Sequence, residues 1–332
     1  MNERKLRRFC TAMILFAMLT RLLGGVGAGR FAFSEDSAEA ETRVWPVRLL
    51  AAKPADEPSD EIAELPAENS APPERQIAAE VTKLPEAFSA AEADVITIAG
   101  ASTYTADKAA LLTRPSTLTA ETDGPKVLIV HTHGTEAYTM PAGEEYEASD
   151  DHRTLEKEKN MIRVGDEIAR VLTDAGLGVL HDRELYDYPN YSGAYNRSLA
   201  AIEKYRAEYP SLLYILDVHR DAVADSEGNN YKLLCAEEPG AAQLEFVIGS
   251  SGGGLEHPDW RENLKLACAV QETLYAKYPT LMRPVTVRNS RYNQQVTTGS
   301  LLIEVGTAGN SLDEALAAAR LFAAGFAETV LA

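Results

Sequence analysis

The chain has 332 residues, of which 45% are hydrophobic and 25% are charged, a mixture typical of globular proteins that can bury a core. This composition excludes wholesale disorder. Its 32 lysines and arginines face 50 aspartates and glutamates, so the net charge is −18. Nucleic-acid binding needs an excess of cations to displace counterions from phosphates, and we therefore expect no nucleic-acid partner. Three cysteines, Cys10, Cys235 and Cys268, form neither a disulfide framework nor a C-x-x-C pair.

Residues 1–33 combine a basic start with a short apolar core. Four basic residues between positions 4 and 8 precede the apolar stretch 9–19, and small residues fill positions 24–29. This order predicts a signal peptide or a signal-anchor, with the remainder of the chain outside the cytoplasm. The apolar core is shorter than the roughly 20 residues that a spanning helix prefers, so the pattern leaves open whether the segment is cleaved.

Residues 34–95 form an acidic segment rich in alanine and proline. The stretch 54–76 alone holds five prolines, seven acidic residues and one base, Arg75. Such a stretch cannot bury enough apolar surface to offset the entropy lost on ordering, and we expect a disordered tether here. Residues 96–124 are expected to be a linker or a leading strand, and residues 125–332 a folded domain.

Beyond residue 125, short apolar runs rich in β-branched residues alternate with helical patterns. The predicted strands are 127–130, 212–218, 246–248 and 300–305, and the predicted helices are 161–172, 192–205, 260–278 and 312–330. This alternation predicts an α/β domain with a mostly parallel, twisted sheet flanked by helices. In such domains the functional site lies at the carboxyl ends of the strands.

Polar residues gather where these predicted strands end. His131, His133 and Glu136 follow the first strand, His219 ends the second, and Glu304 lies inside the last. Imidazoles and a carboxylate as ligands, with a second carboxylate to move protons, are what a zinc hydrolase needs. We therefore predict a zinc site formed by His133, Glu136 and His219. His131 remains an alternative ligand, because alternate residues of an extended chain face the same side.

Glu304 is the predicted proton carrier of this site. A carboxylate in an apolar strand is costly to bury without a purpose, and desolvation raises its pKa toward the range useful for acid–base catalysis. A salt bridge to Arg220 or Arg288 is the plain structural alternative. Arg220 is itself predicted to stabilise an oxyanion, or else to pair with Asp217 or Asp221. Asp217 could instead orient a ligand imidazole.

Residues 249–253 match the G-x-S-x-G pattern of a serine nucleophile elbow. That elbow needs a helix immediately after the serine, whereas this segment continues through Gly254, His257 and Pro258. We interpret it as a flexible glycine- and serine-rich loop that lines a cleft.

Six segments in chain order resemble the stage II sporulation protein P family, which comprises peptidoglycan hydrolases of endospore-forming bacteria. The segments are LIVHTHGTEAY (128–138), NMIRVG (160–165), YSGAYNRS (191–198), DVHRDA (217–222), HPDWRENLKLA (257–267) and NQQVTTGSLLIEVGTAGN (293–310). The family is similar to zinc-dependent N-acetylmuramoyl-L-alanine amidases, which cut the amide between the muramic lactyl group and the first L-alanine of the stem peptide. The resemblance also implies endopeptidase activity on peptide crosslinks.

The resemblance assigns site residues, partners and a location to this chain. It implies metal ligation by His133 (or His131), Glu136 and His219, and catalysis by Glu304. In the broader amidases the carboxylate ligand comes from an E-K-x-x-N pattern, which Glu156 also fits here. The resemblance further implies peptidoglycan as substrate, attachment to the mother-cell membrane with the hydrolase domain outside the cytoplasm, and partnership with the other stage II engulfment proteins, including a lytic transglycosylase.

Two rival functions share parts of this pattern. A zinc carboxypeptidase-type peptidase also uses His-x-x-Glu and a late glutamate, and it needs a basic clamp for which Arg288 and Arg291 are candidates. A non-catalytic cell-wall-binding module would leave Glu304 as a buried acid without chemistry.

Overall fold

The computed structural model describes residues 98–100, 115–120, 122–226 and 228–332. The predicted signal segment (1–33) and acidic tether (34–95) lie outside the described residues, as does most of the stretch 96–124. Within the described part of the chain, none of the helices combines the length and the apolar character needed to cross a membrane.

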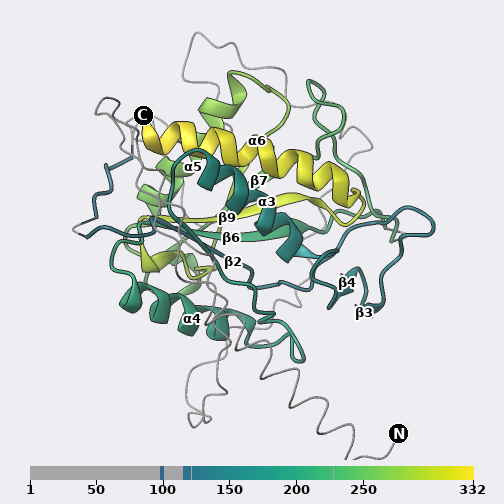
Figure 1. The fold of residues 1–332 in the computed structure, drawn as a ribbon, viewed down its shortest axis with the longest axis horizontal. Coiled ribbons are helices and arrows are strands. Elements are labelled where there is room, and N and C mark those ends of the chain that lie inside the picture. Colours follow the sequence, from purple (N-terminus) through teal and green to yellow (C-terminus); the bar gives the residue numbers. More distant parts are fainter. Residues whose placement is uncertain (1–97, 101–114, 121, 227) are drawn as a thin grey trace, which may run out of the picture. The chain divides into compact units, whose positions relative to one another are not determined.

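A seven-stranded sheet with strand order β1-β8-β7-β9-β6-β2-β5 forms the centre of the domain (Figure 1). Its strands are β1 (Ile98–Gly100), β2 (Val127–Val130), β5 (Val179–His181), β6 (Tyr214–Asp221), β7 (Leu244–Gly249), β8 (Val285–Arg288) and β9 (Gly299–Thr307). A separate small hairpin pairs β3 (Ala148–Asp150) with β4 (Arg153–Thr154).

The sheet is mostly parallel, as predicted, but it contains one reversal of direction. β5, β2, β6 and β9 run parallel to one another. β7 pairs antiparallel with β9, and β8 and β1 run in the same direction as β7. The connection 222–243 between β6 and β7 contains no helix among its described residues, so the chain does not return to the opposite edge of the sheet before β7 begins. β7, predicted as residues 246–248, therefore does not end at the same edge as the other three predicted strands, and neither does β8. Their carboxyl ends lie at the edge opposite those of β2, β6 and β9.

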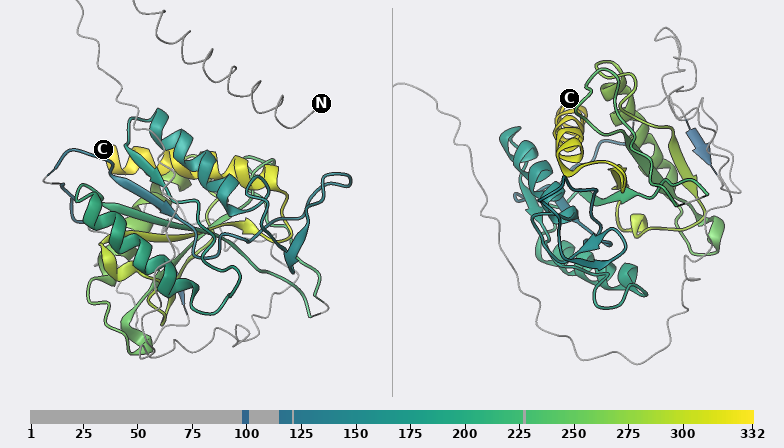
Figure 2. Two further views of the ribbon diagram at one scale, coloured as in Figure 1. Left: turned by 60° about the horizontal axis from the view of Figure 1, so that its bottom comes forward. Right: turned by 90° about the vertical axis from the view of Figure 1, so that its right-hand side faces the viewer.

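Helices cover both faces of the sheet. α3 (Met161–Asp174), α5 (Trp260–Tyr275) and α6 (Leu312–Leu331) pack on one face, and α4 (Ala194–Glu208) packs on the other (Figures 1 and 2). Alternate residues of β2 serve the two faces, because Val127 and Ile129 belong to the larger core and Leu128 and Val130 to the smaller one. Every residue of β2 is thus buried, which explains its uninterrupted apolar run.

Local sequence explains where the helices begin. The side chain of Asn160 accepts a hydrogen bond of 3.0 Å from the backbone N–H of Ile162 at the start of α3. Ser311 and Glu314 form a capping box at the start of α6. All four predicted helices and all four predicted strands are present, with ends shifted by a few residues. β5 and β8 were not predicted, because each mixes apolar and polar residues over only three or four positions, unlike the wholly apolar β2.

Candidate metal centre

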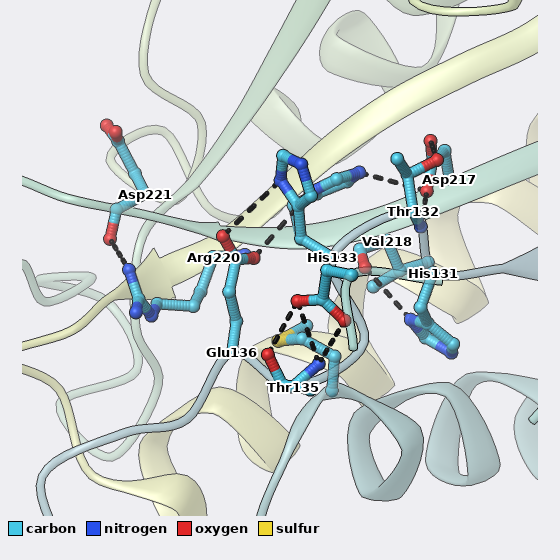
Figure 3. Close-up of polar contacts among 12 residues, drawn as sticks. His131, Thr132, His133, Thr135, Glu136, Asp217, Val218, Arg220 and Asp221 are labelled. Atoms are coloured by element: carbon cyan, nitrogen blue, oxygen red, sulfur yellow. Dashed lines mark hydrogen bonds and ion pairs between the residues drawn. The ribbon is translucent and has the colours of Figure 1, made fainter. Parts of the chain in front are cut away.

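Three side chains from two neighbouring strands meet at the edge where β2 and β6 end. His133 and Glu136 lie in the turn after β2 (Figure 3). A hydrogen bond of 3.2 Å from the Glu136 N–H to the His133 carbonyl closes this turn. His219 lies in β6. Each is at most 7% exposed. One ligand atom from each side chain lies within 4.8 Å of the other two.

The spacing of these donor atoms fits a tetrahedral metal site. His133 Nδ1 is 3.7 Å from Glu136 Oε1, and His219 Nδ1 is 3.6 Å from Glu136 Oε2. Zinc bonds of about 2.0–2.2 Å in a tetrahedron hold neighbouring ligand atoms about 3.4 Å apart. Two imidazoles and one carboxylate are also the donor set of known catalytic zinc sites, and they leave a fourth position for water. The cluster is therefore consistent with a zinc site.

Asp217 lies behind the imidazole of His219. Its Oδ1 is 2.9 Å from His219 Nε2, at an angle that departs from hydrogen-bond geometry, and His219 Nδ1 faces Glu136. Asp217 is fixed in turn by the backbone N–H (2.8 Å) and the hydroxyl (2.6 Å) of Thr132. Asp217 thus lies beside the nitrogen of His219 that is turned away from Glu136, and its orienting role stays a prediction.

Glu136 is held at both carboxylate oxygens. The backbone N–H of Arg220, at the point where the β6–β9 register shifts, donates to Oε2 at 3.2 Å. The guanidinium of Arg153 donates to Oε1 at 3.3 Å and is itself fixed by buried Asp187, at 2.5 Å. Sequence reasoning missed Arg153 and Asp187, because they come from the β3–β4 hairpin and the loop after β5, and neither belongs to a motif.

Burial and charge set the protonation of the cluster. Desolvation lowers the pKa of His133 to about 3, so this ring is neutral, as a ligand must be. Burial by itself would lower the pKa of His219 and raise that of Glu136. The ion pairs with Asp217 and Glu136 instead raise the pKa of His219 well above its usual value, and contact with His219 and Arg220 lowers the pKa of Glu136.

Glu304 lies beside the cluster, on β9 directly across from His219. Its Oε2 is shielded from solvent and has no hydrogen-bond partner among the described residues. Desolvation, followed by the nearby carboxylate of Asp221, raises its pKa well above the ordinary value for glutamate. Neither Arg220 nor Arg288 forms an ion pair with Glu304 in the described part of the chain. Arg283, which interacts electrostatically with Glu304, is paired with Asp221 (2.8 Å) and Glu245 (2.6 Å).

The guanidinium of Arg220 lies against backbone carbonyls. Nε donates to Ala137 O at 3.0 Å, and Nη2 donates to His152 O at 2.9 Å. These bonds tie the turn after β2 to the β3–β4 hairpin. The predicted oxyanion role of Arg220 stays a prediction, while its observed contacts are those of a residue that fixes the backbone around Glu136.

The two alternative ligands lie outside the cluster. His131 is buried and directs Nδ1 to the Val218 carbonyl (2.9 Å) and Nε2 to His181 Nε2 (2.8 Å), as Figure 3 shows for the first contact. The chain turns after β2 and does not stay extended, so His131 and His133 face different surroundings. The Glu156 side chain is 41% exposed, accepts from the Glu147 N–H at 2.7 Å and pairs with Lys159 at 3.1 Å.

The glycine- and serine-rich loop 249–253 follows β7 and so lies at the opposite edge of the sheet. Ser251 Oγ is bonded to the backbone of His257, both as donor to its carbonyl and as acceptor from its N–H, each at 3.0 Å. The next α-helix begins only at Trp260. This segment lacks the geometry of a nucleophile elbow, in agreement with the interpretation from the sequence.

Fold and site together define an α/β protein with a buried cluster of two histidines and a carboxylate at one edge of a mostly parallel sheet. The chain belongs to the stage II sporulation protein P (SpoIIP) family, whose family model matches residues 49–327. The stage II sporulation protein P of Bacillus subtilis (strain 168) is 29% identical over an alignment of 228 residues, and the match covers 63% of this chain and 52% of that protein. The chain thus spans about half the length of the curated relative that it matches.

Among solved structures, three bacterial N-acetylmuramoyl-L-alanine amidases resemble the chain distantly. AmiC2 of Nostoc punctiforme is 15% identical with a TM-score of 0.35, over 63% of this chain and 97% of that one. The enzyme from Clostridium difficile 630 is 16% identical with a TM-score of 0.37, over 63% and 96%. Ami1 from Mycobacterium smegmatis is 13% identical with a TM-score of 0.38, over 63% and 96%. At TM-scores this low we draw no conclusion from these likenesses.

Proposed function

We propose that this chain is a zinc-dependent peptidoglycan hydrolase with N-acetylmuramoyl-L-alanine amidase activity. The observation that carries the proposal is the buried cluster of His133, Glu136 and His219 with the shielded carboxylate of Glu304 beside it. Membership of the SpoIIP family supports a role in sporulation.

Each residue of the site has a separate role in the proposed amide hydrolysis. His133, Glu136 and His219 would hold the zinc ion, which supplies a Lewis acid that lowers the pKa of water and polarises a carbonyl. Glu304 takes a proton at its shielded Oε2 and passes it to the leaving amine, a task that its raised pKa suits. Asp217 keeps His219 in the orientation that ligation needs.

The wider biological setting is part of the same proposal. We propose that the chain is held on the mother-cell membrane by its N-terminal segment, with the hydrolase domain outside the cytoplasm. There it would cut peptidoglycan during engulfment, together with the other stage II engulfment proteins, including a lytic transglycosylase. Endopeptidase activity on peptide crosslinks is proposed as a second activity of the same site.

The positions of two arginines weigh against the carboxypeptidase alternative. Arg288 ends β8 at the edge opposite the cluster, and Arg291 donates to the Glu256 carbonyl there at 3.5 Å. A clamp for a terminal carboxylate would have to lie beside the cluster. The wall-binding alternative gives no purpose to the shielded Oε2 of Glu304, which has no hydrogen-bond partner among the described residues.

The test is digestion of purified peptidoglycan by the full-length chain, with and without a zinc chelator, followed by mass analysis of the products. We expect intact stem peptides that carry a free L-alanine amine, and we expect the chelator to abolish their release. His219→Ala should release none, while Glu156→Gln should match the wild type. Cleavage within stem peptides only, or equal cleavage with chelator, would contradict the amidase assignment.

A further inference from the structure

A buried series of hydrogen bonds leads from Asp217 away from the candidate metal centre. The backbone N–H and the hydroxyl of Thr132 donate to the two carboxylate oxygens of Asp217 at 2.8 and 2.6 Å (Figure 3). The Thr132 hydroxyl lies 2.7 Å from the Ser198 hydroxyl, and the side-chain amide of Asn293 donates to Ser198 Oγ at 3.1 Å. We call Asp217, Thr132, Ser198 and Asn293 the Asp217 network.

The hydrogen atoms of this network all point toward Asp217. Thr132 has one hydroxyl hydrogen, which it donates to the carboxylate, so Ser198 must be the donor in the bond between the two hydroxyls. Ser198 Oγ in turn accepts from the Asn293 amide. The Tyr195 carbonyl lies 3.2 Å from Ser198 Oγ but receives a shorter bond of 2.8 Å from Asn293, so it does not need the Ser198 hydrogen. Hydrogen bonds aligned in one direction polarise and strengthen one another.

The far end of the Asp217 network is fixed by the segment that follows β8. Asn293 has φ +55°, in the left-handed region that asparagine tolerates better than most residues. Its amide nitrogen must face the Tyr195 carbonyl, because a carbonyl only accepts. The neighbouring Gln294 ties the same segment to β7, because it donates to the Val247 carbonyl and accepts from the Gly249 N–H, each at 2.8 Å. The donor end of the network is therefore held in one place.

The Asp217 network is shielded from water along its whole length. Thr132 and Ser198 are 0% exposed, Asp217 is 4% exposed and Asn293 is 8% exposed. Removal of one hydroxyl would therefore leave a buried polar neighbour without a partner, which costs more than the loss of a bond at the surface. The network also joins three parts of the fold that are distant in the sequence, namely the end of β2, helix α4 and the segment after β8.

The position of the Asp217 carboxylate depends on this network. The carboxylate lies 2.9 Å from Nε2 of His219, and bonds to both of its oxygens leave it a single orientation beside that ring. The Thr132 hydroxyl can turn toward Asp217 or toward Ser198. Because Ser198 donates to it, the Thr132 hydrogen stays directed at Asp217.

We infer that Thr132 and Ser198 are positioning residues of the metal centre, which hold the Asp217 carboxylate where it orients the imidazole of His219 for zinc binding. The inference rests on the proposed function, because it needs the zinc site. Neither hydroxyl belongs to the ligand cluster, and both act through Asp217.

The test is the zinc affinity of the full-length chain, measured by competition with a chromophoric chelator. Thr132→Val removes the hydroxyl with little change of shape and should weaken zinc binding about tenfold. Thr132→Ser keeps the hydroxyl and should restore the affinity to within about twofold of the wild type. Ser198→Ala should weaken zinc binding about three- to fivefold, because the bond that it removes is one step further from Asp217.

Ser211→Ala is the matched control, because Ser211 is 1% exposed and donates to the Pro125 carbonyl at 2.7 Å, outside the Asp217 network. It should bind zinc as the wild type does, although it also loses a buried hydrogen bond. The visible absorption of the cobalt(II)-substituted chain gives a second measurement, since it depends on ligand geometry. The spectrum should change in Thr132→Val and Ser198→Ala and stay unchanged in Ser211→Ala.

A double variant tests whether Ser198 acts through Thr132. In the presence of Thr132→Val, Ser198→Ala should not weaken zinc binding further, because the connection to Asp217 is already broken. Additive effects of the two substitutions would overturn the role of Ser198. Zinc affinities of Thr132→Val and Ser198→Ala that equal that of Ser211→Ala would overturn the whole inference.

The outcomes separate this inference from the proposed function. Zinc binding that depends on Thr132 and Ser198, without any release of stem peptides from peptidoglycan, would uphold the positioning residues and contradict the amidase. Zinc-dependent release of stem peptides, with wild-type zinc affinity in both variants, would do the reverse. A wild-type chain that binds no zinc would overturn both.

Discussion

Asp217 and His219 form a buried pair in which the carboxylate lies 2.9 Å from Nε2, on the far side of the ring from Glu136. Asp217 receives two bonds from Thr132 and therefore cannot swing away. Nδ1, the nitrogen that we propose as the zinc ligand, faces Glu136. In metal sites such a carboxylate also makes the imidazole a stronger ligand.

Replacement of Asp217 by Asn should weaken zinc binding by about 10- to 100-fold, because the imidazole loses its anionic partner. Competition with a chromophoric chelator measures this affinity directly. Asp151→Asn, at a side chain that is 94% exposed, is the matched control and should bind zinc as the wild type does. Equal zinc affinity in the two variants would remove Asp217 from this role.

Glu245 should contribute to the pH at which Glu304 works. The two residues are paired across β7 and β9, and the charge of Glu245 helps to raise the pKa of Glu304, after burial, Asp221 and Glu136. A proton acceptor is active above its pKa, so the acidic limb of the kcat/KM profile reports that pKa. Glu245→Gln should move this limb to lower pH, and Arg283 keeps Asp221 as a partner.

Glu304→Gln should lower kcat by about 10²- to 10⁴-fold without loss of zinc. This variant calibrates the Glu245 experiment, since it removes the titrating group altogether. An acidic limb that stays in place in Glu245→Gln would mean that another group controls it.

The sequence predicted the cluster because its residues lie at the ends of strands that run in the same direction. His133, Glu136 and His219 follow β2 or lie in β6, and the parallel pairing of these strands brings them together. The choice between His131 and His133 required the structure, since the chain after β2 turns. Glu156 matched a motif, yet its side chain faces solvent beside Lys159.

Other features of the structure could not be predicted from the sequence. Arg153 reaches Glu136 only because the β3–β4 hairpin folds back over the turn. The reversal at β7 depends on a connection without a helix, which hydrophobic periodicity does not register. The ring contact between Tyr195 and Tyr292 joins two segments almost a hundred residues apart, and no spacing rule predicts it.

Gly165 should be indispensable for the packing between α3 and the two histidines. A Cβ at this position would lie 2.5 Å from His181 Nε2 and 2.7 Å from His131 Cε1. Both rings are buried and hydrogen-bonded to each other, so a displacement of either ring would cost free energy. Gly165→Ala should lower the free energy of unfolding by about 1–3 kcal/mol, as measured by chemical denaturation.

Gly240→Ala is the control for this substitution, because a Cβ there has nothing within 4 Å. It should leave the free energy of unfolding within about 0.5 kcal/mol of the wild-type value. Equal stability of the two variants would show that the histidine pair can rearrange.

His131 should make the fold sensitive to acid. Burial, followed by repulsion from His181, lowers its pKa from 6.5 to about 3 in the folded chain. As the pH falls below about 6.5, the unfolded chain takes up a proton at this residue while the folded chain does not, so stability is lost between pH 6.5 and 3.

His131→Gln removes this contribution. Its unfolding free energy should fall with pH by about 1.4 kcal/mol per pH unit less steeply than that of the wild type over this window. Urea denaturation of the zinc-free chain at pH 4, 5, 6 and 7 measures both slopes, and the histidines that do not contact His131 cancel in the difference. Parallel slopes would mean that His131 is already protonated in the folded chain, and that the contact of its Nε2 with His181 is made by a cation.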